Sequence, residues 1–232
     1  MQKLESIAER IRQDFDARTA TRDKALATAR QLTRACSLAI RAAHRLETDG
    51  GMAGQLAEAR SLADALRASL AAYPDLYYAG YTQDALKEFV EANVTCALIQ
   101  QQPLPTPEEL GVIGSTYLNG LAEVVGELRR RTLDILRHGY SNEAERLLTT
   151  MDDIYDVLVT IDYPDAITAG LRRQTDVARS IIEKTRGDIT FSLRGEYLEQ
   201  AMGRLSGQLN SDQPERSDEA GAHPIQDDSR EN

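Results

Sequence analysis

Hydrophobic residues recur at helical spacing along almost the whole chain. In the first segment they follow one stripe, with a weaker middle, in steps of three or four residues. The members of this stripe are Leu4, Ile7, Ile11, Phe15, Leu32, Cys36, Ala39, Ala43 and Leu46. No run of alternating polar and apolar residues is long enough to predict a strand. The pattern therefore predicts an all-α protein.

Glycine, proline and capping residues divide this pattern into about seven helices. The strongest start signal is Thr106-Pro107 followed by Glu109, because Thr can cap, Pro suits the first helical position and Glu completes a capping box. Gly114 marks a candidate break in the helix that follows. The predicted helices cover residues 4–49, 56–73, 82–100, 106–139, 141–161, 165–186 and 196–205.

Length and composition are those of one globular domain. The chain has 232 residues, 41% of them hydrophobic, and its two cysteines exclude a disulfide-rich scaffold. The first residues carry charge throughout and form no signal sequence, and no stretch approaches the roughly 20 apolar residues of a membrane span. We therefore expect a cytoplasmic protein that makes no contact with membranes.

The charge of the chain is unevenly distributed. The formal net charge of −10 argues against binding to nucleic acid, because phosphate contacts need Lys and Arg. Half of that charge, however, lies in residues 211–232, which contain seven acidic and two basic residues. This segment also lacks the apolar residues needed to form a core. We expect a folded domain over residues 1–206 and a disordered acidic tail over residues 207–232.

Two pairs of acidic residues are the most informative candidates for chemistry. Glu88 and Glu91 are three residues apart, and Glu123 and Glu127 are four apart, so each pair lies on one side of its helix. Like charges at this spacing destabilise a helix unless a cation such as Mg²⁺ or Mn²⁺ neutralises them. Both pairs fall on polar faces, however, and an ordinary solvated surface fits them equally well. Spacing alone leaves both interpretations open.

Four segments of the sequence resemble the translin family, and in particular its catalytic branch of translin-associated factor X. They are KEFVEA at 87–92, GLAEVVGELRRRTLDILRHG at 120–139, MDDIYDVLVTID at 151–162 and SLRG at 192–195. The resemblance extends from about residue 4 to residue 202. It implies an all-α subunit of about seven helices, which assembles into a hollow homo-octamer and binds single-stranded RNA or DNA.

The same resemblance implies an activity and a site. In the catalytic branch, the acids that hold Mg²⁺ fall on elements that correspond here to Glu88, Glu91, Glu123 and Glu127, and all four positions are acidic. The non-catalytic branch lacks the first pair. The resemblance thus implies a Mg²⁺-dependent endoribonuclease that cleaves single-stranded or processed RNA inside an oligomeric shell. The alternative is a non-catalytic subunit of the translin type that only binds single strands or supports assembly.

Three basic positions near the second acid pair are candidate RNA contacts: Arg130, Arg137 and His138. Arg130 shares the polar face with Glu123 and Glu127, where an intrahelical ion pair explains it equally well. Arg137 also fits a solvated surface. His138 follows the end of its helix, where a cation next to the negative end of the helix dipole is the simpler explanation.

Overall fold

The computed structural model describes residues 1–46 and 50–211, and it contains only helices and connecting turns within these ranges. The helices are α1 (Gln2–His44), α2 (Gly51–Leu70), α3 (Pro74–Tyr77), α4 (Gly80–Ile99), α5 (Pro107–Leu110), α6 (Gly114–Leu136), α7 (Asn142–Val159), α8 (Asp165–Thr168) and α9 (Leu171–Ser211). Three of them, α3, α5 and α8, are single turns of four residues. The predicted all-α class is confirmed.

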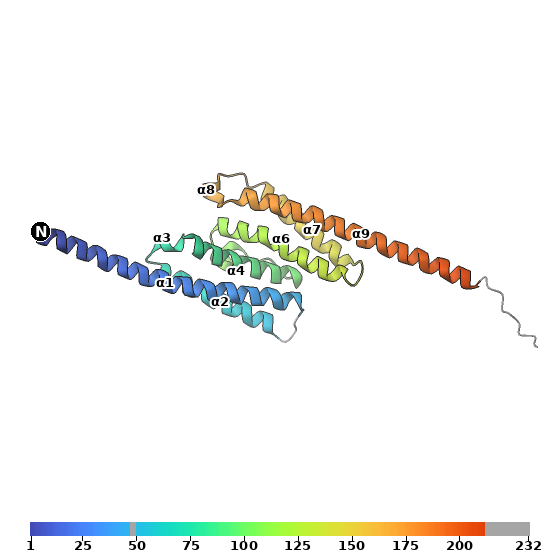
Figure 1. Cartoon of the computed structure of the whole chain (residues 1–232), viewed down its shortest axis with the longest axis horizontal. Coiled ribbons are helices and arrows are strands. Elements are labelled where there is room, and N and C mark those ends of the chain that lie inside the picture. Colours follow the sequence, from blue (N-terminus) through green and yellow to red (C-terminus); the bar gives the residue numbers. More distant parts are fainter. Residues whose placement is uncertain (47–49, 212–232) are drawn as a thin grey trace, which may run out of the picture.

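The long helices lie side by side in an elongated bundle (Figure 1). α1 packs against α2 and α4, α4 packs against α6, and α6 packs against both α7 and α9. The order of packing places α4 and α6 in the middle of the bundle. The N-terminal part of α1 extends beyond one end of the bundle, and the C-terminal part of α9 extends beyond the other.

The contact between α4 and α6 is unusually close at one point. Gly120 of α6 faces α4, and a Cβ atom added there would lie 2.7 Å from the Cβ of Val90 and 2.9 Å from the carbonyl oxygen of Lys87. The neighbouring side chains Phe89, Val124 and Val125 are fully buried. Glycine thus lets the two helices approach within a distance that any side chain would prevent, and this fixes the relative position of the residues that both helices carry.

Most predicted helix boundaries are close to those in the structure, with one clear error. Thr106 and Glu109 form the predicted capping box, and Gly111, in the left-handed conformation, separates α5 from α6. The predicted break between residues 186 and 196 is wrong, because α9 continues through Gly187 and Gly195. A glycine inside a helix costs only about 1 kcal/mol, and no proline or cap stops the helix there.

The predicted end of the last helix at residue 205 is also too early, because α9 continues to Ser211, and the domain boundary at residue 206 stays a prediction. Residues 212–232, which make up most of the predicted disordered tail, lie outside the described residues, so that interpretation stays a prediction. In the described part of the chain, every helix is too short or too polar to cross a membrane.

The two projecting ends of the bundle expose apolar side chains. In residues 2–24 of α1, which we call the α1 arm, Leu4 is 67% exposed and Phe15 is 61% exposed. In residues 190–208 of α9, the α9 arm, Phe191 is 76% exposed and Leu198 is 61% exposed. Within the described residues, these side chains remain largely open to solvent.

Candidate functional site

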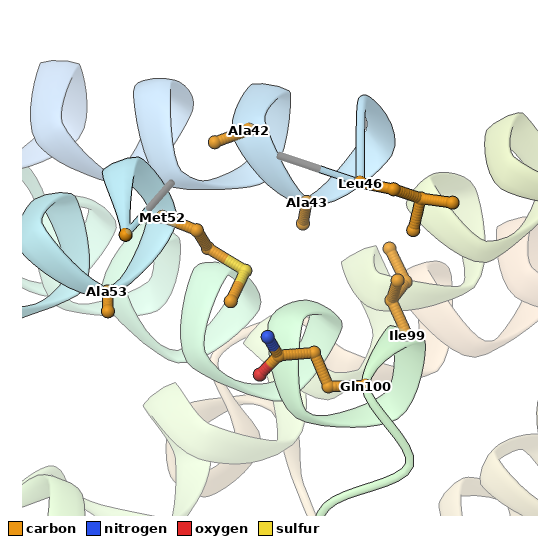
Figure 2. Close-up of a pocket in the computed structure, with 8 residues that line it drawn as sticks. Ala42, Ala43, Leu46, Met52, Ala53, Ile99 and Gln100 are labelled. Atoms are coloured by element: carbon orange, nitrogen blue, oxygen red, sulfur yellow. The ribbon is translucent and has the colours of Figure 1, made fainter. Parts of the chain in front are cut away.

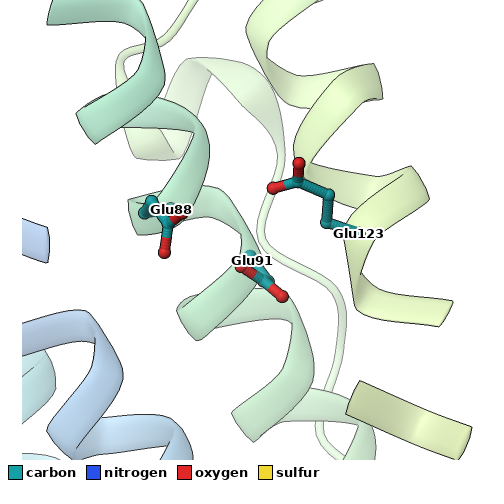
Figure 3. A group of neighbouring side chains, drawn as sticks. All are labelled: Glu88, Glu91 and Glu123. Atoms are coloured by element: carbon teal, nitrogen blue, oxygen red, sulfur yellow. The ribbon is translucent and has the colours of Figure 1, made fainter. Parts of the chain in front are cut away.

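Three of the four predicted acids lie together between the central helices. One carboxylate oxygen from each of Glu88, Glu91 and Glu123 lies within 4.8 Å of the other two (Figure 3). Glu88 and Glu91 come from α4 and Glu123 comes from α6, so the close contact between these helices brings them together. We call these three residues the carboxylate triad.

The carboxylate triad is half-buried, whereas the spacing of the acids alone left an ordinary solvated surface open as an alternative. α4 is a central helix, with α1 on one side and α6 on another, so its polar face is covered as well as its apolar one. The helical pattern identified which residues share a face, but not how many faces the neighbouring helices cover.

Burial and mutual repulsion change the ionisation of the triad. Burial, followed by the charges of Glu88, Glu123 and Glu127, raises the pKa of Glu91 to about 8. Burial and the charge of Glu123 also raise the pKa of Glu88. The direction of both shifts indicates that burial and the repulsion among the carboxylates outweigh the neighbouring positive charge. Oxygen donors with uncompensated charge are what a hard divalent cation requires, so the residues present fit Mg²⁺ or Mn²⁺.

Lys87 is a member of the site that sequence reasoning did not identify. Its Nζ donates a hydrogen bond of 2.7 Å to Oε1 of Glu123, and Nε2 of Gln174 on α9 donates a longer one, of 3.4 Å, to the same oxygen. Burial alone would lower the pKa of Lys87, but the hydrogen bond to Glu123 and the charge of that carboxylate raise it above its ordinary value. One oxygen of Glu123 is therefore held by two partners.

The fourth predicted acid, Glu127, lies outside the group of three and has a different partner. Nε2 of His44 lies 2.5 Å from Oε2 of Glu127, and Nη1 of Arg130 lies 3.8 Å from the same oxygen. The hydrogen bond from His44 lowers the pKa of Glu127, against the opposing effect of burial. We call these two residues the His44–Glu127 pair.

His44 was not a predicted site residue, and its role could not be found from local sequence. It is the last residue of α1 and lies 83 residues before Glu127. Its side chain is 4% exposed, and its buried Nδ1 atom has no hydrogen-bond partner among the described residues. The backbone carbonyl of His44 accepts a hydrogen bond of 3.3 Å from Arg131, which also anchors this end of α1 to α6.

The three predicted RNA contacts lie on the surface near the end of α6. Arg130 is exposed and pairs with Glu127. Arg137 and His138 are exposed and line a cavity of about 550 Å³ beyond the C-terminal end of α6. His44 and Arg131 line the same cavity, so it connects these exposed basic residues to the His44–Glu127 pair.

A second cavity lies away from these charged groups. It has a volume of about 370 Å³ and forms where the end of α1, the start of α2 and the end of α4 meet (Figure 2). Among the described residues its lining includes Ala42, Met52, Ile99 and Gln100, and these side chains do not titrate.

Comparison with known proteins places the chain among relatives of similar length. No protein-family model matches the sequence. The chain is 33% identical over 185 residues to uncharacterized protein MJ0175 of Methanocaldococcus jannaschii, an alignment that covers 79% of this chain and 82% of the relative.

The chain is also similar to solved structures. Two structures of AfC3PO, one of them a complex with duplex RNA, are 32% identical with a TM-score of 0.74, and each match covers 81% of this chain and 97% of AfC3PO. The structure of apo-NeC3PO matches with a TM-score of 0.73, over 80% of this chain and 96% of the NeC3PO chain. Because the two sequences are only 23% identical, this match supports the fold alone.

The all-helical bundle therefore has the same fold as the proteins in the C3PO structures. The chain belongs to the translin family.

Proposed function

We propose that this protein is a metal-dependent endoribonuclease that uses Mg²⁺ or Mn²⁺. The observation that carries this proposal is the convergence of the three triad carboxylates within 4.8 Å on two different helices. The similarity to AfC3PO, which has been solved with duplex RNA, supports RNA as the substrate.

The carboxylate triad would hold the cation, because its oxygen donors are close together and their charge is uncompensated. When bound, a divalent cation polarises water and the scissile phosphate, which is the chemistry that carboxylates cannot supply alone. We propose that Glu127 belongs to the same reaction, from its position beside the triad.

The protein's own side chains orient this site. Lys87 and Gln174 hold one oxygen of Glu123, which fixes the carboxylate of α6 relative to the two on α4. His44 holds Glu127 in its ionised form and in one orientation. Around neutral pH, without a cation, the carboxyl of Glu91 retains a proton for much of the time, and it must lose this proton before it can ligate a cation.

The proposed substrate is single-stranded or processed RNA. Arg130, Arg137 and His138 are the proposed phosphate contacts, since all three are exposed at or beyond the C-terminal part of α6. Cleavage by water, and not by the ribose 2′-hydroxyl, would give products with 5′-phosphate and 3′-hydroxyl ends. Single-stranded DNA is a second proposed ligand.

We further propose that the protein works as a homo-octamer. The exposed apolar residues of the α1 arm and of the α9 arm support association, because apolar patches of this kind mark surfaces where other proteins bind. The two arms extend from opposite ends of the bundle, so contacts between copies can continue from one subunit to the next (Figure 1). Light scattering at micromolar concentration should give a mass near eight chains, and the mass of a single chain would contradict this.

The test of the activity uses labelled single-stranded RNA and DNA with the full chain. We expect cleavage in Mg²⁺ or Mn²⁺, none in EDTA, and products with 3′-hydroxyl ends. Binding without cleavage in either metal would favour the alternative, a non-catalytic nucleic-acid-binding subunit. Products that end in a cyclic 2′,3′-phosphate would contradict the assigned chemistry.

A further inference from the structure

A lysine lies directly against the carboxylate triad, in a chain whose basic residues are mostly arginines. Lys3, Lys24, Lys87 and Lys184 are the four lysines among 27 lysine and arginine residues. Lys87 directs its Nζ to Glu123 at 2.7 Å, and its side chain is only 21% exposed. An ammonium is a compact point charge, whereas a guanidinium is a flat fork, so lysine is the side chain that can best substitute for a small cation.

The charges of the site balance with a single divalent cation. The three ionised carboxylates of the triad and the ammonium of Lys87 together carry a charge of −2. One Mg²⁺ or Mn²⁺ neutralises this group, whereas two cations would leave it positive. Metal pairs in two-metal sites lie about 3.5–4 Å apart and share carboxylates. Here Oε1 of Glu123 already accepts from Lys87 and Gln174, which limits its use in a bridge.

We propose that Lys87 is a resident counter-cation of the carboxylate triad. It holds Glu123 in place, limits the site to one divalent cation, and weakens the binding of that cation by its own positive charge. The inference depends on the proposed function, since it assumes that the triad binds a cation. If Lys87 only links α4 to α6, its charge should have no effect on metal binding.

Metal binding can be measured directly on the full chain, without RNA, by calorimetric titration with Mn²⁺. We expect one Mn²⁺ per wild-type chain. Lys87→Met should bind Mn²⁺ at least about tenfold more tightly, because removing a nearby positive charge strengthens the attraction for a cation. Lys87→Arg, which keeps the charge, should stay within about threefold of the wild type.

Lys184→Met is the matched control. This residue is exposed on α9 and lies ten residues beyond Gln174, which corresponds to about 15 Å along the helix. The Lys184→Met substitution removes the same charge from the chain at a distance from the triad. The affinity of this variant for Mn²⁺ should therefore equal that of the wild type.

Thermal unfolding gives a second readout that does not depend on affinity. In EDTA, Lys87→Met should unfold at a lower temperature than the wild type, because the half-buried triad has lost its counter-charge. Saturating Mn²⁺ should remove this difference. If Lys87→Met does not fold, Lys87→Gln, which keeps a hydrogen-bond donor, replaces it in both measurements.

The possible failures are distinguishable. If the wild type binds two Mn²⁺ per chain, or if Lys87→Met and the wild type bind one Mn²⁺ equally well, the role of Lys87 is wrong while the metal site stands. If the wild type binds no Mn²⁺ at millimolar concentration, both the proposed function and the proposed role of Lys87 are wrong.

Discussion

Glu123 and Glu127 lie one helical turn apart on α6, yet they belong to two different electrostatic environments. Glu123 faces two other carboxylates and shares one lysine with them. Glu127 faces a histidine at 2.5 Å and an arginine at 3.8 Å. The carboxylate triad therefore has more negative charge than its neighbours offset, whereas the His44–Glu127 pair is compensated within the protein.

The ionisation of the two groups follows from this difference. The pKa of Glu91 rises to about 8 by burial and repulsion, while the pKa of Glu127 falls below its ordinary value through its bond with His44. Uncompensated carboxylates attract an external cation, and compensated ones do not need one. This difference favours the triad as the proposed metal site, and Glu127 as a proposed catalytic carboxylate that contributes less to metal affinity.

The largest expected effect comes from replacing one acid of each group. Glu91→Gln should weaken Mn²⁺ binding by about 100-fold or more and abolish RNA cleavage, because the amide keeps the volume but removes the charge that holds a hard cation. Glu127→Gln should also abolish cleavage, but it should change Mn²⁺ affinity by less than about tenfold. Calorimetry and a cleavage assay measure both, with the exposed Glu58→Gln on α2 as the control. Equal losses of metal affinity in both variants would show that Glu127 contributes to metal binding as much as Glu91 does.

A substitution at Gly120 should move the triad carboxylates apart without replacing any of them. Gly120→Ala places a Cβ within 3 Å of Val90 and of the backbone of Lys87, so α4 and α6 must separate. We expect a loss of about 2–4 kcal/mol in the free energy of unfolding and a clear loss of Mn²⁺ affinity. Gly126→Ala is the control on the same helix, because its added Cβ meets nothing within 4 Å, and it should stabilise the protein by up to about 1 kcal/mol.

The two groups should also respond to opposite ends of the pH range. Between pH 4.5, the ordinary pKa of a glutamate, and about 8, Glu91 ionises more readily in the unfolded chain than in the folded one. The free energy of unfolding without metal should therefore fall as pH rises through this window, by on the order of 2 kcal/mol. Glu127 acts in the other direction: its contribution to stability is present above pH 4.5 and is lost as the pH falls through its lowered pKa.

Urea unfolding in EDTA across pH 3–9 measures both effects. Glu91→Gln should remove the fall in stability between pH 4.5 and 8 and leave the loss of stability at acid pH unchanged. Glu127→Gln should remove its part of the acid loss and reduce the fall above pH 4.5 only slightly, because Glu127 is the weakest of the three charges that raise the pKa of Glu91. A wild-type stability that stays constant between pH 5 and 8 would show that the triad is better compensated than its surroundings indicate.

The smallest expected effect concerns the surface on the side of the His44–Glu127 pair. Arg137→Ala should weaken RNA binding only about twofold to fivefold and lower the salt dependence by about one unit, as expected for one phosphate contact. Arg173→Ala on α9, also an exposed arginine, is the control and should change neither. Filter binding at several salt concentrations measures both variants. Equal effects of the two would mean that the cavity at the end of α6 has no special role for the substrate.

Local sequence is sufficient for the helical class and most helix ends of this protein, because these depend on neighbours within a turn. The stripe beginning at Leu4, the capping box of Thr106 and Glu109, and the spacing of Glu88 and Glu91 are all local. The resemblance to the translin family selected the four acids from short sequence elements alone. The error at 186–196 was local too, since glycine tolerates a helix as well as it ends one.

Which acids share a site, and what compensates them, depends instead on tertiary packing. Lys87 and Glu123 are 36 residues apart, and His44 and Glu127 are 83 apart, so no local pattern connects them. Their contacts result from the packing of α1, α4 and α6, and the close approach at Gly120 depends on both facing helices. Burial of polar faces and the balance of charge are properties of that packing, and for this reason three acids became one group while the fourth paired with a histidine.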